Sequence, residues 1–355
     1  MPAQAITLEV EGREIRVSNP EKVLFPEPGL TKLDVVNYYL AVSEGALVGS
    51  RDRPCILYRF PNGVEGEGFY QKRVPTHRPE WMRTARITFP SGRSAEMLSM
   101  ADAAHLAWHA NLACLDINPW PVRRTDVDHP DELRVDLDPV PEVPYADVCS
   151  VALVANDVLE EHQLVGFVKT SGKRGMHVTV RIHPRWSFLS VRRAALALAR
   201  EVERRVPDLA TTAWWKEERH GVFVDYNQNA RDRTTASAFS VRPVPDARVS
   251  FPLRWEEVRD VDPSEFRLET VPPLYEKRRD VGADIDEHPG SLDSLLDLAA
   301  RDEEGGLSDA PWPPHFPKGD TEPRRVSPSR RAKMREWERQ RGVGPDGRRR
   351  RDGPR

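Results

Sequence analysis

Hydrophobic and polar positions in the middle third of the chain change repeatedly between strand-like and helix-like spacing. The run Leu133-Arg-Val-Asp-Leu-Asp-Pro139 alternates apolar and charged residues, as expected of a strand with one face in a core. Downstream segments repeat their apolar residues every three to four positions, which is typical of amphipathic helices. In order, the predicted elements are a strand at 133–139, a helix at 145–164, strands at 166–171 and 177–182, a helix at 189–205 and a strand at 222–226.

This order, β-α-β-β-α-β, predicts an α+β fold with a ferredoxin-like or RRM-like sheet. In that topology the last strand lies beside the first, so Asp225 is expected to approach Asp136 and Asp138. Residue parity agrees, because Val222 and Val224 then face the helices while Asp225 faces the other way.

The first third predicts a smaller α/β module packed against this sheet. Thr31 is a candidate helix N-cap with Asp34 three positions later, and the helical pattern runs on through Leu47. Two short strands between Thr84 and Leu98 flank a turn and predict a hairpin. Ser99 is the expected cap of a further helix from Ala101 to about Leu115.

These patterns divide the chain into a catalytic domain over 1–300 and two C-terminal segments. The domain comprises an N-terminal α/β module at 1–130, an RRM-like module at 131–260 and a helical closure at 261–300. A proline-rich strap follows at 301–322, and Pro311-Trp-Pro-Pro-His-Phe-Pro317 is expected to lie against the body with its aromatic residues buried. Residues 323–355 form a basic tail with a short helix near 330–339 and disorder beyond it.

Charge is distributed unevenly between the tail and the body. Residues 323–355 hold 13 Lys/Arg and 4 Asp/Glu, whereas the whole chain of 355 residues has a net charge of −3. The body is therefore acidic, and nucleic-acid contacts are expected only at local basic patches. The absence of a long apolar run excludes a membrane span and predicts a cytoplasmic, nucleoid-associated protein. The three scattered cysteines predict small core residues rather than a zinc site.

The strongest chemical signal is Asp136-Leu137-Asp138. Carboxylates two positions apart share one face of a strand and repel each other, which a divalent cation relieves. With Asp225 added, the set suits a pair of metal ions that activate a 3′-hydroxyl and neutralise a leaving pyrophosphate. Two alternatives remain: the acids merely end a strand and solvate a surface, or the DxD pair belongs to a sugar-nucleotide transferase.

A second signal is the turn Ser171-Gly-Lys-Arg-Gly-Met-His177, between two strands of the same sheet. Glycines let backbone N–H groups approach a phosphate, and Ser171, Lys173 and His177 add donors. The turn lacks the spacing of a Walker loop. An exposed basic hairpin is the alternative.

Three further residues are candidates for contacts with substrate. Arg242 is a candidate phosphate clamp, with a surface ion pair as the alternative. Phe69 and Tyr70 are candidates for stacking on a base, with a half-buried strand as the alternative.

Six motifs, taken together and in order, resemble the polymerase domain of bacterial ATP-dependent ligase D, in the archaeo-eukaryotic primase superfamily. The resemblance extends from about residue 14 to about residue 260, and no Lys-x-Asp-Gly ligase motif occurs, so the chain is similar to a stand-alone relative of that domain. The motifs are Asn19-Pro-Glu-Lys-Val-Leu-Phe25, Phe60-Pro-Asn-Gly-Val64, Arg134-Val-Asp-Leu-Asp-Pro139, Thr170-Ser-Gly-Lys-Arg-Gly-Met-His177, Val222-Phe-Val-Asp-Tyr-Asn-Gln-Asn229 and Ser240-Val-Arg242.

The resemblance implies a role for each matching residue. The metal-binding triad, which would hold two Mn²⁺ (or Mg²⁺) ions, matches Asp136, Asp138 and Asp225. The positions that hold the incoming NTP or dNTP match Ser171, Lys173, His177, Gln228 and Arg242. Those that bind the 5′-phosphate of gapped DNA match Asn19, Lys22 and Lys32, and those that pack against the template match Phe69 and Tyr70. The hairpin at 84–98 corresponds to a loop that aligns broken ends.

One departure concerns the nucleotide sugar. Family members commonly carry a histidine before Pro-Trp, where this chain has Asn118 in Asp116-Ile-Asn-Pro-Trp120. Asn-Pro resembles a stand-alone branch linked to excision repair with a separate ATP-dependent DNA ligase. It weakens the expectation of end joining with Ku.

The sequence therefore predicts a template-dependent nucleotidyltransferase, a primase-polymerase that fills short DNA gaps in repair. Ribonucleotides are the family's general preference. A de novo primase is an alternative within the superfamily. A non-catalytic scaffold that binds DNA ends and recruits a ligase through the basic tail is an alternative of another class.

Overall fold

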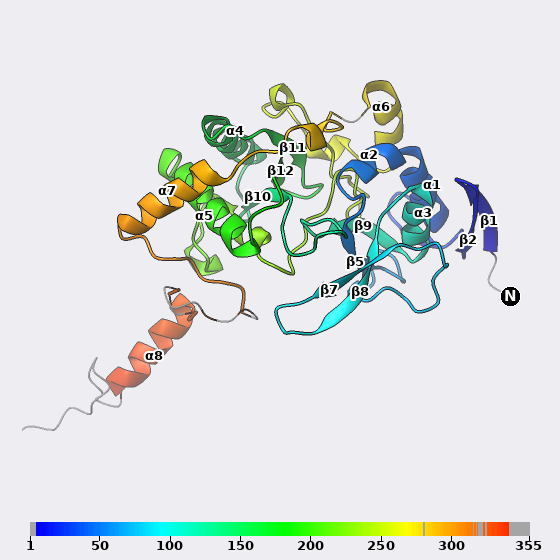
Figure 1. The fold of residues 1–355 in the computed structure, drawn as a ribbon. Coiled ribbons are helices and arrows are strands. Elements are labelled where there is room, and N and C mark those ends of the chain that lie inside the picture. Colours follow the sequence, from blue (N-terminus) through cyan, green and yellow to red (C-terminus); the bar gives the residue numbers. More distant parts are fainter. Residues whose placement is uncertain are drawn as a thin grey trace, which may run out of the picture.

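The computed structural model describes residues 5–279, 281–314, 316, 318, 322–323 and 325–340. In these residues two five-stranded sheets and two two-stranded ribbons combine with helices in a mixed α/β fold (Figure 1). No helix among them is long and apolar enough to cross a membrane. The three cysteines are free and buried, as predicted.

The strands of the middle third form one sheet in the order β11-β12-β10-β14-β13. Its central strand, β10, pairs antiparallel with β12 and with β14. The prediction that the last strand lies beside the first is confirmed, since Leu137 pairs with Val224. The strands are β10 (Glu132–Pro139), β11 (Gly166–Thr170), β12 (Met176–Arg181), β13 (Ala210–Thr211) and β14 (Val222–Val224).

One face of this sheet is covered by α4 (Tyr145–Glu161) and α5 (Phe188–Arg205). Leu133, Val135 and Leu137 of β10 are buried in the main core with the apolar residues of both helices. The even-numbered residues of β10 therefore lie on the opposite face. The sequence did not predict β13, a two-residue strand parallel to β14, because so short a segment has no readable periodicity.

The N-terminal module contains the second sheet and three helices. Its strands are β5 (Pro54–Arg59), β6 (Phe69–Gln71), β7 (Thr84–Thr88), β8 (Ser94–Ser99) and β9 (Cys114–Pro119). The predicted hairpin is confirmed as β7 and β8, whose turn projects from the body (Figure 1). Two ribbons precede this sheet: β1 (Ala5–Val10) with β2 (Arg13–Ser18), and β3 (Val23–Phe25) with β4 (Leu30–Thr31).

Helix starts in this module test the capping predictions. Thr31 caps α1 (Lys32–Ala41) and forms the full capping box with Asp34, as predicted; α2 (Ser43–Val48) continues after a break at Val42. The prediction for the next helix was wrong at both ends. Ser99 ends β8, and α3 (Ala103–Asn111) is capped by Asp102, whose carboxylate accepts the N–H of His105. Leu115 lies in β9, because pairing with β5 outweighs the helical pattern.

The C-terminal helices lie apart from one another (Figure 1). They are α6 (Val271–Arg278), α7 (Asp293–Glu304) and α8 (Pro328–Gln340), of which α7 lies along α5 and α8 extends away from the body (Figure 1). The helix expected near 330–339 corresponds to α8. Trp312 and Phe316 of the strap are partly buried. The disorder predicted for the end of the tail lies outside the described residues.

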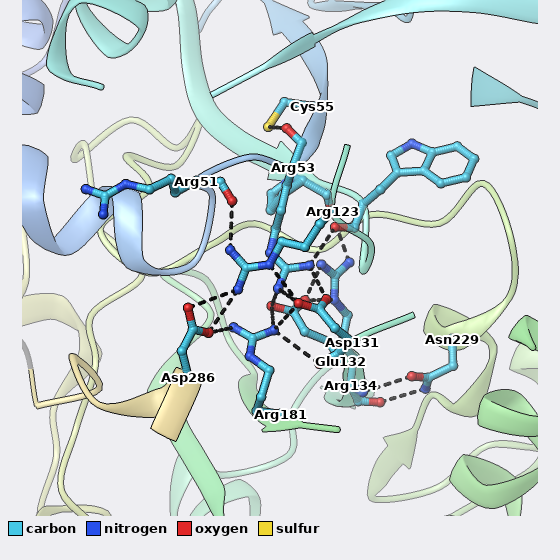
Figure 2. Close-up of polar contacts among 12 residues, drawn as sticks. Arg51, Arg53, Cys55, Arg123, Asp131, Glu132, Arg134, Arg181, Asn229 and Asp286 are labelled. Atoms are coloured by element: carbon cyan, nitrogen blue, oxygen red, sulfur yellow. Dashed lines mark hydrogen bonds and ion pairs between the residues drawn. The ribbon is translucent and has the colours of Figure 1, made fainter. Parts of the chain in front are cut away.

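A buried ionic cluster connects β10 to Arg53 of the N-terminal module and to Asp286 in the C-terminal part (Figure 2). Arg53 binds Asp131 through two hydrogen bonds of 2.6 and 2.8 Å and lies 3.0 Å from Glu132. Arg134 and Arg181 complete the shell around Glu132, and Asp286 pairs with Arg181. The side chain of Arg53 is fully buried, so none of these charges can be left unpaired without cost.

The arginines keep the two carboxylates ionised. Burial alone would raise the pKa of Glu132, but Arg53, Arg134 and Arg181 lower it to about 2. Burial likewise raises the pKa of Asp131, but Arg53, Arg181 and Arg123 outweigh it. The pKa of Asp131 is therefore well below its ordinary value. The cluster thus holds the start of β10 against the N-terminal module at neutral pH.

We expect Glu132→Gln to lower the free energy of unfolding by about 3 to 5 kcal/mol, because it leaves buried arginines without a compensating carboxylate. Urea denaturation at pH 7 measures this. The control is Glu276→Gln, an exposed site on α6 that should stay within about 0.5 kcal/mol of the parent. Equal stability of the two variants would contradict the assigned role of the cluster.

Candidate active site

Three acidic residues meet at the end of the central strand. Asp136 and Asp138 lie on the face of β10 that is turned away from α4 and α5. Asp225 follows β14 directly, and its backbone N–H donates to the carbonyl of Asp136 at 2.8 Å. The structure therefore brings together the three acids that the sequence selected.

Their environment opposes full ionisation in the absence of a cation. Burial and the carboxylates of Asp225 and Asp138 raise the pKa of Asp136 to about 7. Burial also raises the pKa of Asp225. Carboxylate oxygens in such a set suit a hard divalent cation, whose charge relieves the repulsion.

The side chains do not form a ready-made metal site. Within the described residues, no three His, Cys, Asp or Glu side chains are arranged to hold a metal ion. The carboxylate of Asp225 instead accepts the N–H of Asn227 at 2.9 Å, and Gln228 lies 3.4 Å from its other oxygen. The donor chemistry fits a metal, but the carboxylates would have to turn toward a shared ion.

The basic turn between β11 and β12 is pressed against this strand. Ser171 is buried, and its hydroxyl accepts the N–H groups of Lys173 and Gly175. A Cβ at Gly175 would lie 2.1 Å from the carbonyl oxygen of Leu137, between the two acids. Only glycine lets the turn come so close to β10.

Arg242 lies on the other side of the same turn. Gly172 has φ +69°, and a Cβ there would meet the side chain of Arg242 at 2.4 Å. Arg242 Nε and Nη1 are buried without a hydrogen-bond partner among the described residues. A buried guanidinium with free donors fits an anion such as a phosphate.

Asn118 and Asp116 lie on β9, close to Arg242. Asn118 Nδ2 donates to the carboxylate of Asp116 at 2.8 Å, and Asp116 lies 3.8 Å from Arg242 Nη1. Burial raises the pKa of Asp116, which Arg242 opposes. Sequence reasoning selected Asn118 but missed Asp116, although strand parity places the two on one face.

His177 belongs to a buried chain that the sequence did not predict. It pairs with Asp136 across the sheet, and its Nε2 lies 3.4 Å from the Asp136 carboxylate. Its Nδ1 lies 2.6 Å from Lys169 Nζ, which also donates to Ser250. Burial and nearby cations lower the pKa of His177 and of Lys169 well below their ordinary values. A lysine inside the buried strand β11 was the available signal.

The candidate 5′-phosphate residues form a separate group at the start of α1. Asn19 and Lys22 are exposed in one turn, and the Lys22 carbonyl accepts the backbone N–H of Lys32. Lys32 is buried, and its ammonium donates to the carbonyl of Ser18. Burial, Lys22 and Arg59 lower the pKa of Lys32. Only Asn19 and Lys22 are thus free to face solvent.

Phe69 and Tyr70 are exposed on β6, an edge strand of the N-terminal sheet. Tyr70 stacks on Tyr58 with ring centroids 4.1 Å apart, and Arg59 lies over Phe69. Burial raises the pKa of Tyr70 to about 12, with a smaller contribution from the neighbouring Tyr58. Exposed, ordered aromatics of this kind suit stacking on bases.

Comparisons with known proteins identify a family that this chain resembles over most of its length. The family described as LigD, primase-polymerase domain, matches residues 31–281. The multifunctional non-homologous end joining protein LigD of Mycolicibacterium smegmatis is 29% identical over 307 residues, which cover 86% of this chain and 40% of that protein. The LigD of Mycobacterium tuberculosis H37Rv is 31% identical over 265 residues, 70% of this chain and 34% of that protein. The chain thus spans about two fifths or less of the length of these relatives.

A solved structure shares the fold as well as the sequence. The polymerase domain of Mycobacterium tuberculosis ligase D, in complex with DNA, superposes with a TM-score of 0.72 at 30% identity. The match covers 78% of this chain and 99% of that chain.

The raised pKa of Asp136 predicts a pH-dependent stability without metal. The folded state holds the proton of Asp136 more tightly than the unfolded chain does. The contribution of this proton to the free energy of unfolding is therefore full below the unfolded pKa and is lost as the pH rises through about 7. With a chelator present, we compare the free energy of unfolding of Asp136→Asn with that of the parent. This difference should shift by roughly 3 kcal/mol in favour of the variant when the pH is raised from about 4.5 to about 8. Urea denaturation at both pH values measures the gain.

The matched control for this measurement is Asp157→Asn, at an exposed position on α4. This variant should not reproduce the gain of Asp136→Asn, because α4 packs on the face of the sheet opposite the three acids. If the stability of Asp136→Asn relative to the parent did not change with pH, the proposed repulsion among the three acids would be contradicted.

Proposed function

The chain belongs to the LigD primase-polymerase domain family, and we propose that it is a template-dependent nucleotidyltransferase that fills short gaps in DNA during repair. The observation that carries this proposal is the acid group of Asp136 and Asp225 beside a buried guanidinium, that of Arg242, with unused donors. Acids of this kind bind metal ions, and the guanidinium suits the triphosphate on which such ions act. The four antiparallel strands beneath them, β11, β12, β10 and β14, are assigned as the ferredoxin-like unit of a primase-type core.

Asp136, Asp138 and Asp225 would hold two Mn²⁺ or Mg²⁺ ions, which supply Lewis-acid activation of a 3′-hydroxyl and neutralise the charge of the departing pyrophosphate. The raised pKa of Asp136 supports this role, because a bound cation is what would ionise it fully at neutral pH.

The triphosphate is assigned to the turn at 171–177 and to Arg242. Gly172 and Gly175 keep the turn close to Arg242 and to β10, and Lys173 is exposed at its tip. Arg242 would bind phosphate oxygens through its free donors, and Gln228, which already reaches Asp225, is assigned to the same substrate. Asn118, held by Asp116, is assigned to the nucleotide sugar.

The DNA is assigned to two surfaces of the N-terminal module. Asn19 and Lys22 would bind a downstream 5′-phosphate, with Lys32 fixing their turn from behind. Phe69 and Tyr70 would pack against the template. The relatives are named for non-homologous end joining, so broken ends are a second class of substrate for the same site. A separate ATP-dependent DNA ligase and Ku are the partner proteins proposed for that second class of substrate.

The test is primer extension on gapped DNA with a 5′-phosphate and Mn²⁺. Asp136→Ala should reduce extension at least about 10³-fold, because the carboxylate would hold the metal ions that act on the reacting groups. The control Asp157→Ala, at an exposed position on α4, should extend at the parental rate. Normal extension by Asp136→Ala would sink the catalytic assignment.

The same assay separates the competing activities when its substrates are varied. Gapped and end-joining DNA, each with NTP or dNTP, report the preferred repair intermediate and sugar. Products from a single-stranded template without a primer would instead identify a de novo primase. DNA binding without extension on any substrate would favour a scaffold.

A further inference from the structure

A buried arginine connects the C-terminal strap to the segment that carries Asp225. Arg192 lies on α5 with 1% of its side chain exposed, and it uses all of its donor groups. Nε donates to Asn227 Oδ1 at 2.6 Å, and Nη1 donates to Asp309 at 2.8 Å. Nη2 donates to the carbonyls of Ala310 and Pro311.

Asn227 is held from two sides and holds Asp225 in turn. Its side-chain oxygen accepts from Arg192, and its Nδ2 donates to the carbonyl of Pro311 at 3.1 Å. Its backbone N–H donates to Asp225 Oδ1 at 2.9 Å. The strap and the candidate metal ligand are therefore joined through two residues.

Aromatic packing fixes the same arginine in place. The guanidinium lies 4.0 Å from the ring centre of Trp312, in the strap, and 5.2 Å from that of Tyr226, next to Asp225. Trp312 Nε1 donates to the carboxylate of Asp309, so the strap is ordered around Arg192. A planar guanidinium that stacks and forms a fork of hydrogen bonds cannot be replaced by a lysine without loss.

The strap lies outside the part of the chain that matches the family. That match ends at residue 281, whereas Asp309, Pro311 and Trp312 come about thirty residues later. The contact therefore joins a segment beyond residue 281 to the region of the matched domain that carries Asp225.

We propose that residues 309–312 of the strap position the carboxylate of Asp225 for metal binding, through Arg192 and Asn227. This inference rests on the proposed function, because it assigns a control element to the same acids. Arg192 is a positioning residue: it touches neither metal nor substrate, and it acts by fixing the loop whose N–H group orients Asp225. Outer-shell partners of this kind change metal affinity roughly 10- to 100-fold when they are removed.

The adjacent arginine on the same helix provides a matched control. Arg193 also pairs with the C-terminal part of the chain, through Glu303 at 2.6 Å, but its side chain is partly exposed (38%) and does not contact Asn227. Arg193→Ala removes an ion pair between the same two parts of the chain and leaves the path to Asp225 intact.

The experiment measures binding of Mn²⁺ alone by electron paramagnetic resonance of the free ion, using the full-length parent, Arg192→Lys, Asp309→Ala and Arg193→Ala. Circular dichroism and thermal melts establish that each protein is folded. We expect the Mn²⁺ Kd to rise roughly 10-fold in Arg192→Lys and Asp309→Ala and to stay within twofold of the parent in Arg193→Ala. Primer extension should show the same shift in the Mn²⁺ concentration for half-maximal rate, while the nucleotide KM at saturating Mn²⁺ stays unchanged.

Several outcomes would overturn the inference. Parental Mn²⁺ affinity in folded Arg192→Lys or Asp309→Ala, with only a lower melting temperature, would make the strap a purely structural element. If Arg192→Lys does not fold, the result for Asp309→Ala decides. A parent protein that binds no Mn²⁺ and extends no primer would instead refute the proposed function, together with everything built on it.

Discussion

The buried ionic cluster at the start of β10 is the interaction on which the rest of the structure depends. It joins Arg53 of the N-terminal module, Asp131 and Glu132 of the central strand region, and Arg181 of β12 (Figure 2). Burying so many charges is favourable only when each is paired, so the cluster permits one relative placement of these elements. That placement brings Arg242 and Asp116 from outside the sheet next to the acids on β10.

From the cluster, a series of polar side chains runs along the face of the sheet opposite α4 and α5. Glu132 and Arg134 neutralise each other at one end, Lys169 and His177 follow, and Asp136 and Asp138 lie at the other end. Asn229 holds the segment after β14 against β10, because its amide side chain bonds both the N–H and the carbonyl of Arg134. Carboxylates are paired with arginines in the cluster, whereas at the other end the carboxylates lie next to one another. The proposed metal ions, with their triphosphate, would compensate the negative charge there.

Local patterns in the sequence predicted much of this arrangement. Alternation along β10 placed Asp136 and Asp138 on one face, and the order of elements placed Asp225 beside them. Capping of α1 by Thr31 followed from its neighbour Asp34. The predicted cap of α3 was wrong, because Ser99 and Asp102 are both suitable N-cap residues. Only the extent of β8 decides between them.

The residues that the sequence did not reveal owe their roles to distant partners. Arg53 and Asp131 are 78 positions apart, and Arg192 and Asp309 are 117 positions apart. No local period or motif marks such pairs, so an arginine in an amphipathic helix reads as a surface residue until the fold shows what covers it. Lys169 and Asp116 were also missed, although each had a local signal: a lysine within a buried strand, and the strand face that Asp116 shares with Asn118.

The most direct test of the account is anomalous diffraction from crystals grown with Mn²⁺ and an unreactive nucleoside triphosphate analogue. The account predicts manganese density at the carboxylates of Asp136, Asp138 and Asp225, with the triphosphate between Arg242 and the turn at 171–177. A triphosphate bound elsewhere, with no manganese at these three acids, would contradict it.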